Sequence, residues 1–165
     1  MEVEKIRELV KLKHGTQKRK QGTPYYLHPF AVAQILEDAG YGIEYQIVGL
    51  FHDLLEDTDT TYEELKQISN IEIAEATRLL TKEKGYQMEN YIKRIQENKL
   101  ARPVKVADRI HNMEEAIYAD KAFQKRYLKE TKCYFISLAK GTNLEGKLEN
   151  AIQLIENHLR QENLS

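Results

Sequence analysis

The sequence contains a single cysteine, which limits the chemistry that the chain can support. Cys133 has no second cysteine with which to form an internal disulfide. Its neighbours in the segment TKCYF offer no partner for nucleophilic catalysis or metal binding. We therefore expect Cys133 to be a buried structural residue, which is the usual state of a free cysteine.

Long apolar runs are also missing. No stretch approaches the ~18 uninterrupted apolar residues that a membrane-spanning helix requires. The N-terminal segment MEVEKIRELVKLKH is charged where a signal peptide would be apolar. We expect a cytoplasmic protein without a membrane partner.

Charge of one sign is not in excess, since 25 basic residues face 26 acidic ones. A nucleic-acid-binding protein usually shows a basic surplus, so no nucleic-acid partner is expected. An anionic ligand would have to be recognised locally, which favours a small molecule.

Neither internal repeats, low-complexity tracts nor linkers interrupt the 165 residues, of which 41% are apolar. This length suits one compact domain, and we expect residues 1–165 to form it. Apolar residues recur at helical spacing almost everywhere, and no alternating run is long enough to predict a strand. The predicted fold class is all-α.

The expected helices are separated by glycine-containing or polar segments. Pro29 suits a first helical turn, so a helix should begin at His28 and end near Gly40. Thr60 and Glu63 are spaced as a capping box. The predicted helices cover about Val3–Lys13, His28–Gly40, Glu44–Glu56, Thr60–Ile68, Ile71–Lys82, Tyr86–Glu97, Leu100–Tyr118, Phe123–Ala139 and Leu144–Arg160.

A metal site is indicated by two histidines and two aspartates. His52 and Asp53 would project about 100° apart on an ideal helix. They could therefore supply only part of the coordination of one ion, and other segments of the chain would have to supply the remaining ligands. His28, at a helix start, and Asp108, in the segment ADRIHN, are polar residues in apolar helical contexts. A buried unpaired carboxylate is costly, and a cation would compensate Asp108.

Two imidazoles and two carboxylates suit Mn²⁺ or Fe²⁺, and we favour Mn²⁺, with Zn²⁺, Co²⁺ or Ni²⁺ possible in vitro. Four protein ligands leave coordination positions open, as a catalytic metal needs. Each residue also has an alternative reading: an HD dipeptide alone is nearly uninformative, and His28 alone could be a helix-cap residue.

Glu56 and Asp57 follow His52 and Asp53 by one helical turn. They could therefore lie beside the metal and deprotonate or orient water. The alternative is an exposed helix end, although carboxylates at a helix C-terminus oppose the helix dipole.

The loop HGTQKRKQGTPYY concentrates Lys18, Arg19 and Lys20 just before His28. These residues could bind phosphate or could simply be solvated. Arg19 could in addition stack on a base or bind a phosphate through two hydrogen bonds, which a lysine cannot do. Lys82, in LLTK, is a weaker candidate of the same kind.

Asn112 lies one helical turn after Asp108 and could contact a substrate sugar. His111 is better explained as a structural residue that is hydrogen-bonded within the core. His14 and His158 show no partner pattern.

The segments HGTQKRKQGTPYYLHPFAVA, FHDLLEDT, LLTK and VKVADRIHNM occur in the order found in a known family. Together they resemble the HD-superfamily hydrolase domain of the RelA/SpoT homologues, most of all the stand-alone small alarmone hydrolases. The similarity covers roughly Val10 to Ala116. It implies an all-α bundle that removes the 3′-pyrophosphate from guanosine tetra- or pentaphosphate.

The resemblance also implies roles for individual residues. Mn²⁺ would be held by the residues matching the family's ligands, His28, His52, Asp53 and Asp108. Glu56 and Asp57 would be the catalytic acidic pair. Arg19 would lie against the guanine, with Lys20 nearby and Asn112 at the ribose.

One departure from the family pattern is the pair Glu114-Glu115, which follows HNM where the long members usually carry a basic residue. Alternatives are an HD phosphatase that releases orthophosphate from another nucleotide, such as a nucleoside monophosphate or NADPH, and a non-catalytic nucleotide-binding module. The amphipathic C-terminal helices could cover the core or form a homodimer.

Overall fold

A computed structural model describes residues 2–164 and contains helices but no strand within that range. The only β-type pairing there is an isolated bridge between Lys18 and Pro24, which closes the basic loop. The all-α prediction is confirmed. The helices and helical turns are α1 (Val3–His14), α2 (Leu27–Asp38), α3 (Ile43–Phe51), α4 (Leu54–Asp57), α5 (Tyr62–Ile68), α6 (Ile71–Leu80), α7 (Met88–Gln96), α8 (Ala101–Glu115), η1 (Ala116–Tyr118), α9 (Lys121–Glu130), η2 (Thr131–Phe135), α10 (Ile136–Ala139) and α11 (Glu145–Leu164).

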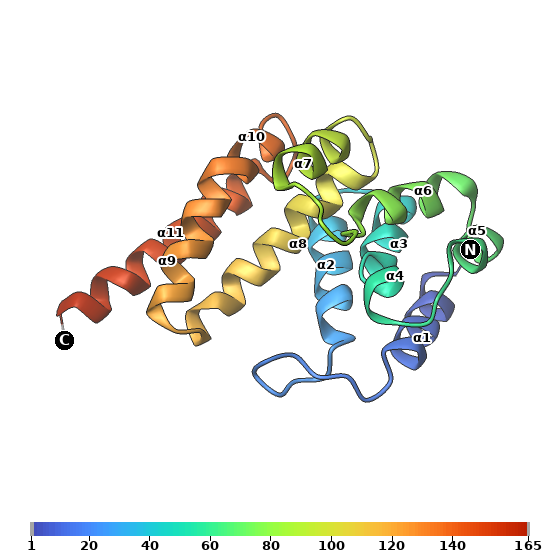
Figure 1. The fold of residues 1–165 in the computed structure, drawn as a ribbon, viewed down its shortest axis with the longest axis horizontal. Coiled ribbons are helices and arrows are strands. Elements are labelled where there is room, and N and C mark those ends of the chain that lie inside the picture. Colours follow the sequence, from blue (N-terminus) through green and yellow to red (C-terminus); the bar gives the residue numbers. More distant parts are fainter. Residues whose placement is uncertain (1, 165) are drawn as a thin grey trace.

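Helix α8 forms the centre of the molecule. Figure 1 shows it running between the N-terminal helices α1–α6 and a C-terminal layer of α9, α10 and α11. Val104, Val106 and Ala107 are fully buried although they point in different directions around the helix. Because the middle of α8 is covered on most sides, the polar side chains of Lys105, Asp108 and Arg109 are buried there and need partners.

Helices α2 and α3 pack closely against each other and against α8. Their contact depends on Gly49, since a Cβ atom there would lie 3.0 Å from Leu36 Cδ1 and 3.4 Å from Val32 Cγ1. This close approach brings the first turn of α2 beside the end of α3. The histidines of the two helices therefore meet.

The expected helix from Glu44 to Glu56 is interrupted. Helix α3 ends at Phe51, and α4 restarts at Leu54 after a turn formed by His52 and Asp53. Asp53 has φ −102° and ψ −4°, which departs from ideal helix geometry. The break changes the directions of both side chains, so the 100° separation of an ideal helix does not apply.

Two smaller predictions were wrong. The capping box is formed one residue later than expected, by Thr61 and Glu64. Cys133 is exposed rather than buried. It lies in η2, a π-helical turn that turns Thr131 and Phe135 inward and leaves Cys133 on the outside.

The predicted C-terminal helices are otherwise present, with η2 interrupting the segment expected as one helix from Phe123 to Ala139. Helix α11 packs against α8 and α9. Between residues 2 and 164, no helix is long and apolar enough to cross a membrane.

Candidate metal and nucleotide site

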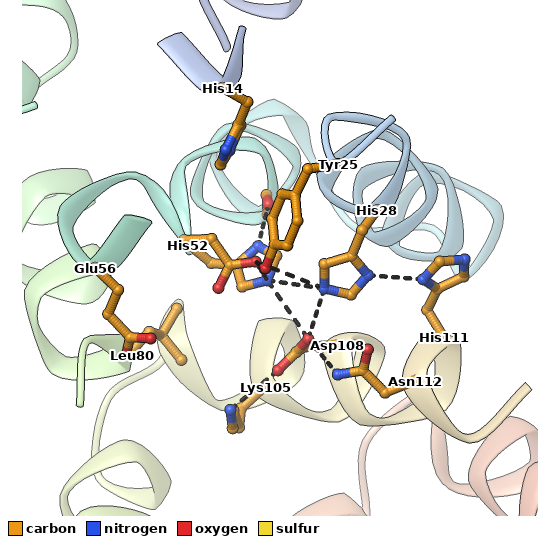
Figure 2. A network of polar contacts seen from close by, with 12 residues as sticks. His14, Tyr25, His28, His52, Glu56, Leu80, Lys105, Asp108, His111 and Asn112 are labelled. Carbon is orange, nitrogen blue, oxygen red and sulfur yellow. Dashed lines mark hydrogen bonds and ion pairs between the residues drawn. The ribbon is translucent and has the colours of Figure 1, made fainter. Parts of the chain in front are cut away.

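The candidate metal ligands converge where α2, the turn after α3, and α8 meet (Figure 2). His28 Nε2 lies 2.9 Å from Asp108 Oδ1 and 3.2 Å from His52 Nε2. Asp53 Oδ2 lies 3.0 Å from His52 Nε2 and 3.7 Å from His28 Nε2. The ligand atoms of His28, His52 and Asp108 all lie within 4.8 Å of one another.

These separations fit one divalent ion. With ligand bonds of about 2.1 Å, neighbouring ligands of such an ion lie about 3 Å apart. Two imidazole nitrogens and carboxylate oxygens are a donor set that transition-metal ions accept. The group His28, His52 and Asp108 can therefore hold a divalent metal, with Asp53 adjacent.

The imidazoles are held by partners on their far sides. His52 Nδ1 donates to the carbonyl oxygen of Gly49 at 2.6 Å, which turns Nε2 toward the cluster. His28 Nδ1 lies 2.7 Å from His111 Nδ1. Because His28 Nε2 faces the cluster, the proton of the His28 imidazole belongs on Nδ1. His28 Nδ1 then donates a hydrogen bond to His111 Nδ1. His111 is thus a half-buried residue that supports His28 through a hydrogen bond, in agreement with the structural role expected from the sequence.

The carboxylates are also fixed. Tyr25 Oη donates to Asp53 Oδ2 at 2.8 Å. Asp108 accepts from Lys105 Nζ on Oδ2 and from Asn112 Nδ2 on Oδ1, both at 3.0 Å. The Asn112 contact confirms that it shares a helix face with Asp108.

The charges of the site favour a cation. Burial opposes ionisation of Asp108, but the neighbouring Lys105 outweighs it and holds the pKa of Asp108 well below its usual range. Burial likewise opposes ionisation of Asp53, yet His52 keeps its pKa low. Burial lowers the pKa of His28 and lowers that of His111 to about 4. Burial opposes protonation of His52, but Asp53 and Asp108 outweigh it and raise the pKa of His52 well above its usual range. The carboxylates are therefore already ionised, as metal binding needs, whereas a cation bound by His52 would displace a proton from it.

Glu56 and Asp57 differ in their positions. Glu56 lines the cavity beside the ligand cluster, and its carboxylate accepts from the backbone N–H of Lys82. Burial raises the pKa of Glu56. Burial and the charge of Asp53 raise the pKa of Asp57, but this residue is not among those that line the cavity.

The cluster forms the floor of an inner compartment of about 180 Å³. An outer compartment of about 670 Å³ adjoins it and has Phe123 in its wall. Four residues line both compartments: Arg19, Tyr25, Asn112 and Tyr127.

The basic candidates divide between these spaces. Lys82 lines the inner compartment, and its ammonium group lies 5.3 Å from the centre of the Tyr86 ring. Lys18 and Lys20 line only the outer compartment, where the Lys20 ammonium lies 5.7 Å from the Phe123 ring centre.

Several residues of the inner compartment were missed by the sequence interpretation. Lys105 stands one helical turn before Asp108, and this spacing was a signal that could have identified it as a partner. Tyr25 and Tyr127 gave no comparable signal. Arg109, also in the wall, lies between the rings of Tyr127 and Phe135, with its Cζ 4.0 and 3.9 Å from their centres.

A family model described as HD domain matches residues 7–142. The chain therefore belongs to the HD domain family, and an HD domain implies a divalent metal. The predicted resemblance to the RelA/SpoT homologues is also confirmed by curated relatives.

A protein named guanosine-3′,5′-bis(diphosphate) 3′-pyrophosphohydrolase, from Aquifex aeolicus (strain VF5), is 38% identical over 146 residues. The alignment covers 84% of this chain and 21% of that relative. A protein named GTP pyrophosphokinase rsh, from Brucella ovis, is 40% identical over 112 residues, which are 61% of this chain and 15% of the relative. The chain thus spans only a small part of the length of these relatives.

Two solved structures share the fold. One, from work describing a metazoan ortholog of SpoT that hydrolyses ppGpp, has a TM-score of 0.78 at 23% identity and covers 92% of this chain and 93% of its own. The other, lmo0812 from Listeria monocytogenes EGD-e, has a TM-score of 0.63 at 25% identity and covers 81% and 98%.

Proposed function

We propose that this chain is a Mn²⁺-dependent hydrolase that removes the 3′-pyrophosphate from guanosine-3′,5′-bis(diphosphate), leaving GDP. The observation that carries the proposal is the ligand cluster at the floor of a small polar compartment that opens into a larger, partly aromatic one. The name of the Aquifex aeolicus relative, whose similarity spans 84% of this chain, supports the choice of substrate.

The metal would be held by His28, His52, Asp53 and Asp108. A mixed set of imidazoles and carboxylates suits Mn²⁺ or Fe²⁺, and we propose Mn²⁺. When bound, the cation supplies Lewis-acid polarisation of a phosphoryl oxygen and makes water nucleophilic at neutral pH.

The substrate would span both compartments. Its 3′-diphosphate would enter the inner one, where Lys82 and the metal site provide positive charge. The nucleoside would occupy the outer one, with the base against Arg19, Lys20 nearby and the ribose beside Asn112.

Glu56 would accept a proton from the attacking water. A raised pKa suits it to this task, because a general base works best when its pKa approaches the working pH. The water oxygen forms a bond to the phosphorus, and the bond from phosphorus to the 3′ oxygen breaks. The proton on Glu56 then passes to the departing 3′ oxygen. We assign Asp57 to the same acidic pair, in support of Glu56.

The test is to incubate the Mn²⁺-loaded protein with guanosine tetraphosphate and to separate the products. We expect GDP and pyrophosphate from the wild type and neither from His52→Ala, whose folding is checked by its melting temperature. Orthophosphate as the product would indicate a phosphatase of another kind. Recovery of intact substrate would refute the assignment.

A further inference from the structure

Glu115, at the C-terminal end of α8, joins three groups that come from different parts of the site. Its Oε2 accepts from Arg19 Nε at 2.8 Å and from Gln21 Nε2 at 2.7 Å. Its Oε1 lies 3.2 Å from His111 Nε2. The basic loop is therefore attached to α8 through this one carboxylate and through Asn112, which accepts from Arg19 Nη2 at 2.7 Å.

The geometry determines which part of Arg19 a ligand can meet. The Nε and Nη2 groups form the side-on edge with which arginine grips a phosphate or carboxylate bidentately. Glu115 and Asn112 already occupy that edge. Arg19 nevertheless lines the outer compartment, and its Cζ lies 5.7 Å from the centre of the Tyr25 ring. What remains for a ligand is the flat face of the guanidinium and its Nη1 group, without the side-on edge.

The negative charge of Glu115 also disfavours phosphate binding at Arg19. The Arg19 and Glu115 side chains are only 14% and 24% exposed, so their attraction is weakly screened. Burial opposes ionisation of Glu115, but Gln21 and Arg19 outweigh it and hold its pKa below its usual range. A phosphate placed against Arg19 would thus also meet a negative charge.

We propose that Glu115 is a positioning and specificity-determining residue that converts Arg19 from a phosphate ligand into a stacking surface for a nucleobase. The inference rests on the proposed function and deepens it, because it concerns which part of the nucleotide enters the outer compartment.

The experiment is a double-mutant cycle of ligand binding, measured by isothermal titration calorimetry on the Mn²⁺-loaded full chain. The variants are Glu115→Gln, Arg19→Ala and the double variant, and the probes are GDP and inorganic pyrophosphate. Glu114→Gln is the matched control, because it removes the same charge from the neighbouring exposed residue.

We expect Glu115→Gln to weaken GDP binding about tenfold, a change within the range of coupling measured between contacting residues. Pyrophosphate binding should stay the same or tighten, since the released Arg19 edge can then reach a phosphate. In the Arg19→Ala background, Glu115→Gln should leave GDP affinity nearly unchanged. The control should bind both probes as the wild type does.

Equal weakening of GDP binding in both backgrounds would overturn the inference, and so would a parallel loss of pyrophosphate binding. Loss of Mn²⁺ in Glu115→Gln would show that Glu115 supports the metal site through His111, and this result would also overturn the inference. If this variant does not fold, Glu115→Asp replaces it, because the shorter side chain keeps the charge but cannot hold Arg19 in the same place.

The two proposals fail separately. Coupling between Arg19 and Glu115 in GDP binding, without pyrophosphate release from guanosine tetraphosphate, would refute the proposed reaction and leave this inference standing. Pyrophosphate release from guanosine tetraphosphate without coupling between Arg19 and Glu115 would support the proposed reaction and refute this inference.

Discussion

Replacing Lys105 by methionine should strongly destabilise the metal-free protein. The Lys105 side chain is buried, and its Nζ lies 3.0 Å from Asp108 Oδ2. Burial lowers the pKa of Lys105, but Asp108 outweighs it and keeps the ammonium charged. The methionine would remove the ammonium group from the enclosed Asp108 carboxylate, which would keep only the imidazoles of His28 and His52 as possible ion-pair partners.

Removing one partner of a buried ion pair costs about 3–5 kcal/mol. For a chain of this size, each kcal/mol shifts the melting temperature by roughly 2–4 °C, so we expect a drop of about 6–20 °C without metal. A divalent cation beside Asp108 Oδ1 would supply the missing positive charge. The drop should therefore be markedly smaller in Mn²⁺.

The measurement is thermal unfolding followed by circular dichroism, once in EDTA and once with Mn²⁺. Lys99→Met is the control, since Lys99 is exposed just before α8 and its replacement should change stability by about 0.5 kcal/mol or less. A metal-free Lys105→Met protein within about 1 kcal/mol of the wild type would refute the ion-pair reasoning. An equal drop with and without Mn²⁺ would refute the metal's contact with Asp108.

Glu56→Gln should lower kcat about 10²- to 10⁴-fold while the bound Mn²⁺, measured by metal analysis, stays the same; loss of the metal would contradict its assignment as a base. Because Glu56 must be ionised to accept a proton and its pKa is raised, wild-type activity should increase with pH through a midpoint above the ordinary glutamate range. That acidic limb should disappear in Glu56→Gln, and its persistence would assign the limb to another group. Gly49→Ala should destabilise the protein by about 1–3 kcal/mol in urea unfolding, since its Cβ would press on Leu36, and an unchanged midpoint would show that α2 and α3 can separate easily.

The fold class could be predicted because helical periodicity is a local property. Apolar residues spaced along α1, α2 and α8 indicate helices whatever those helices pack against. The same holds for the residue types of the candidate ligands, since two histidines and two aspartates in apolar or motif-like contexts indicate a cation. The break at His52 and Asp53 was not predictable in this way, because its sequence is compatible with a continuous helix.

The exposure of Cys133 shows a second limit. Free cysteine is usually buried, but the π-helical turn η2 shifts the helix phase at this point. Such a turn depends on how α9 and α10 pack against α8, and composition does not record that packing.

By itself, the sequence determined that the chain is helical, that it carries the segments of an HD domain, and which residue types were available to hold a metal. Only the tertiary structure decided how they are used. Arg19 and Glu115 are 96 residues apart in the chain yet form an ion pair, and His28 reaches His111 across 83 residues. Contacts over such distances arise from the packing of α2 and the basic loop on α8, which local residue patterns do not specify.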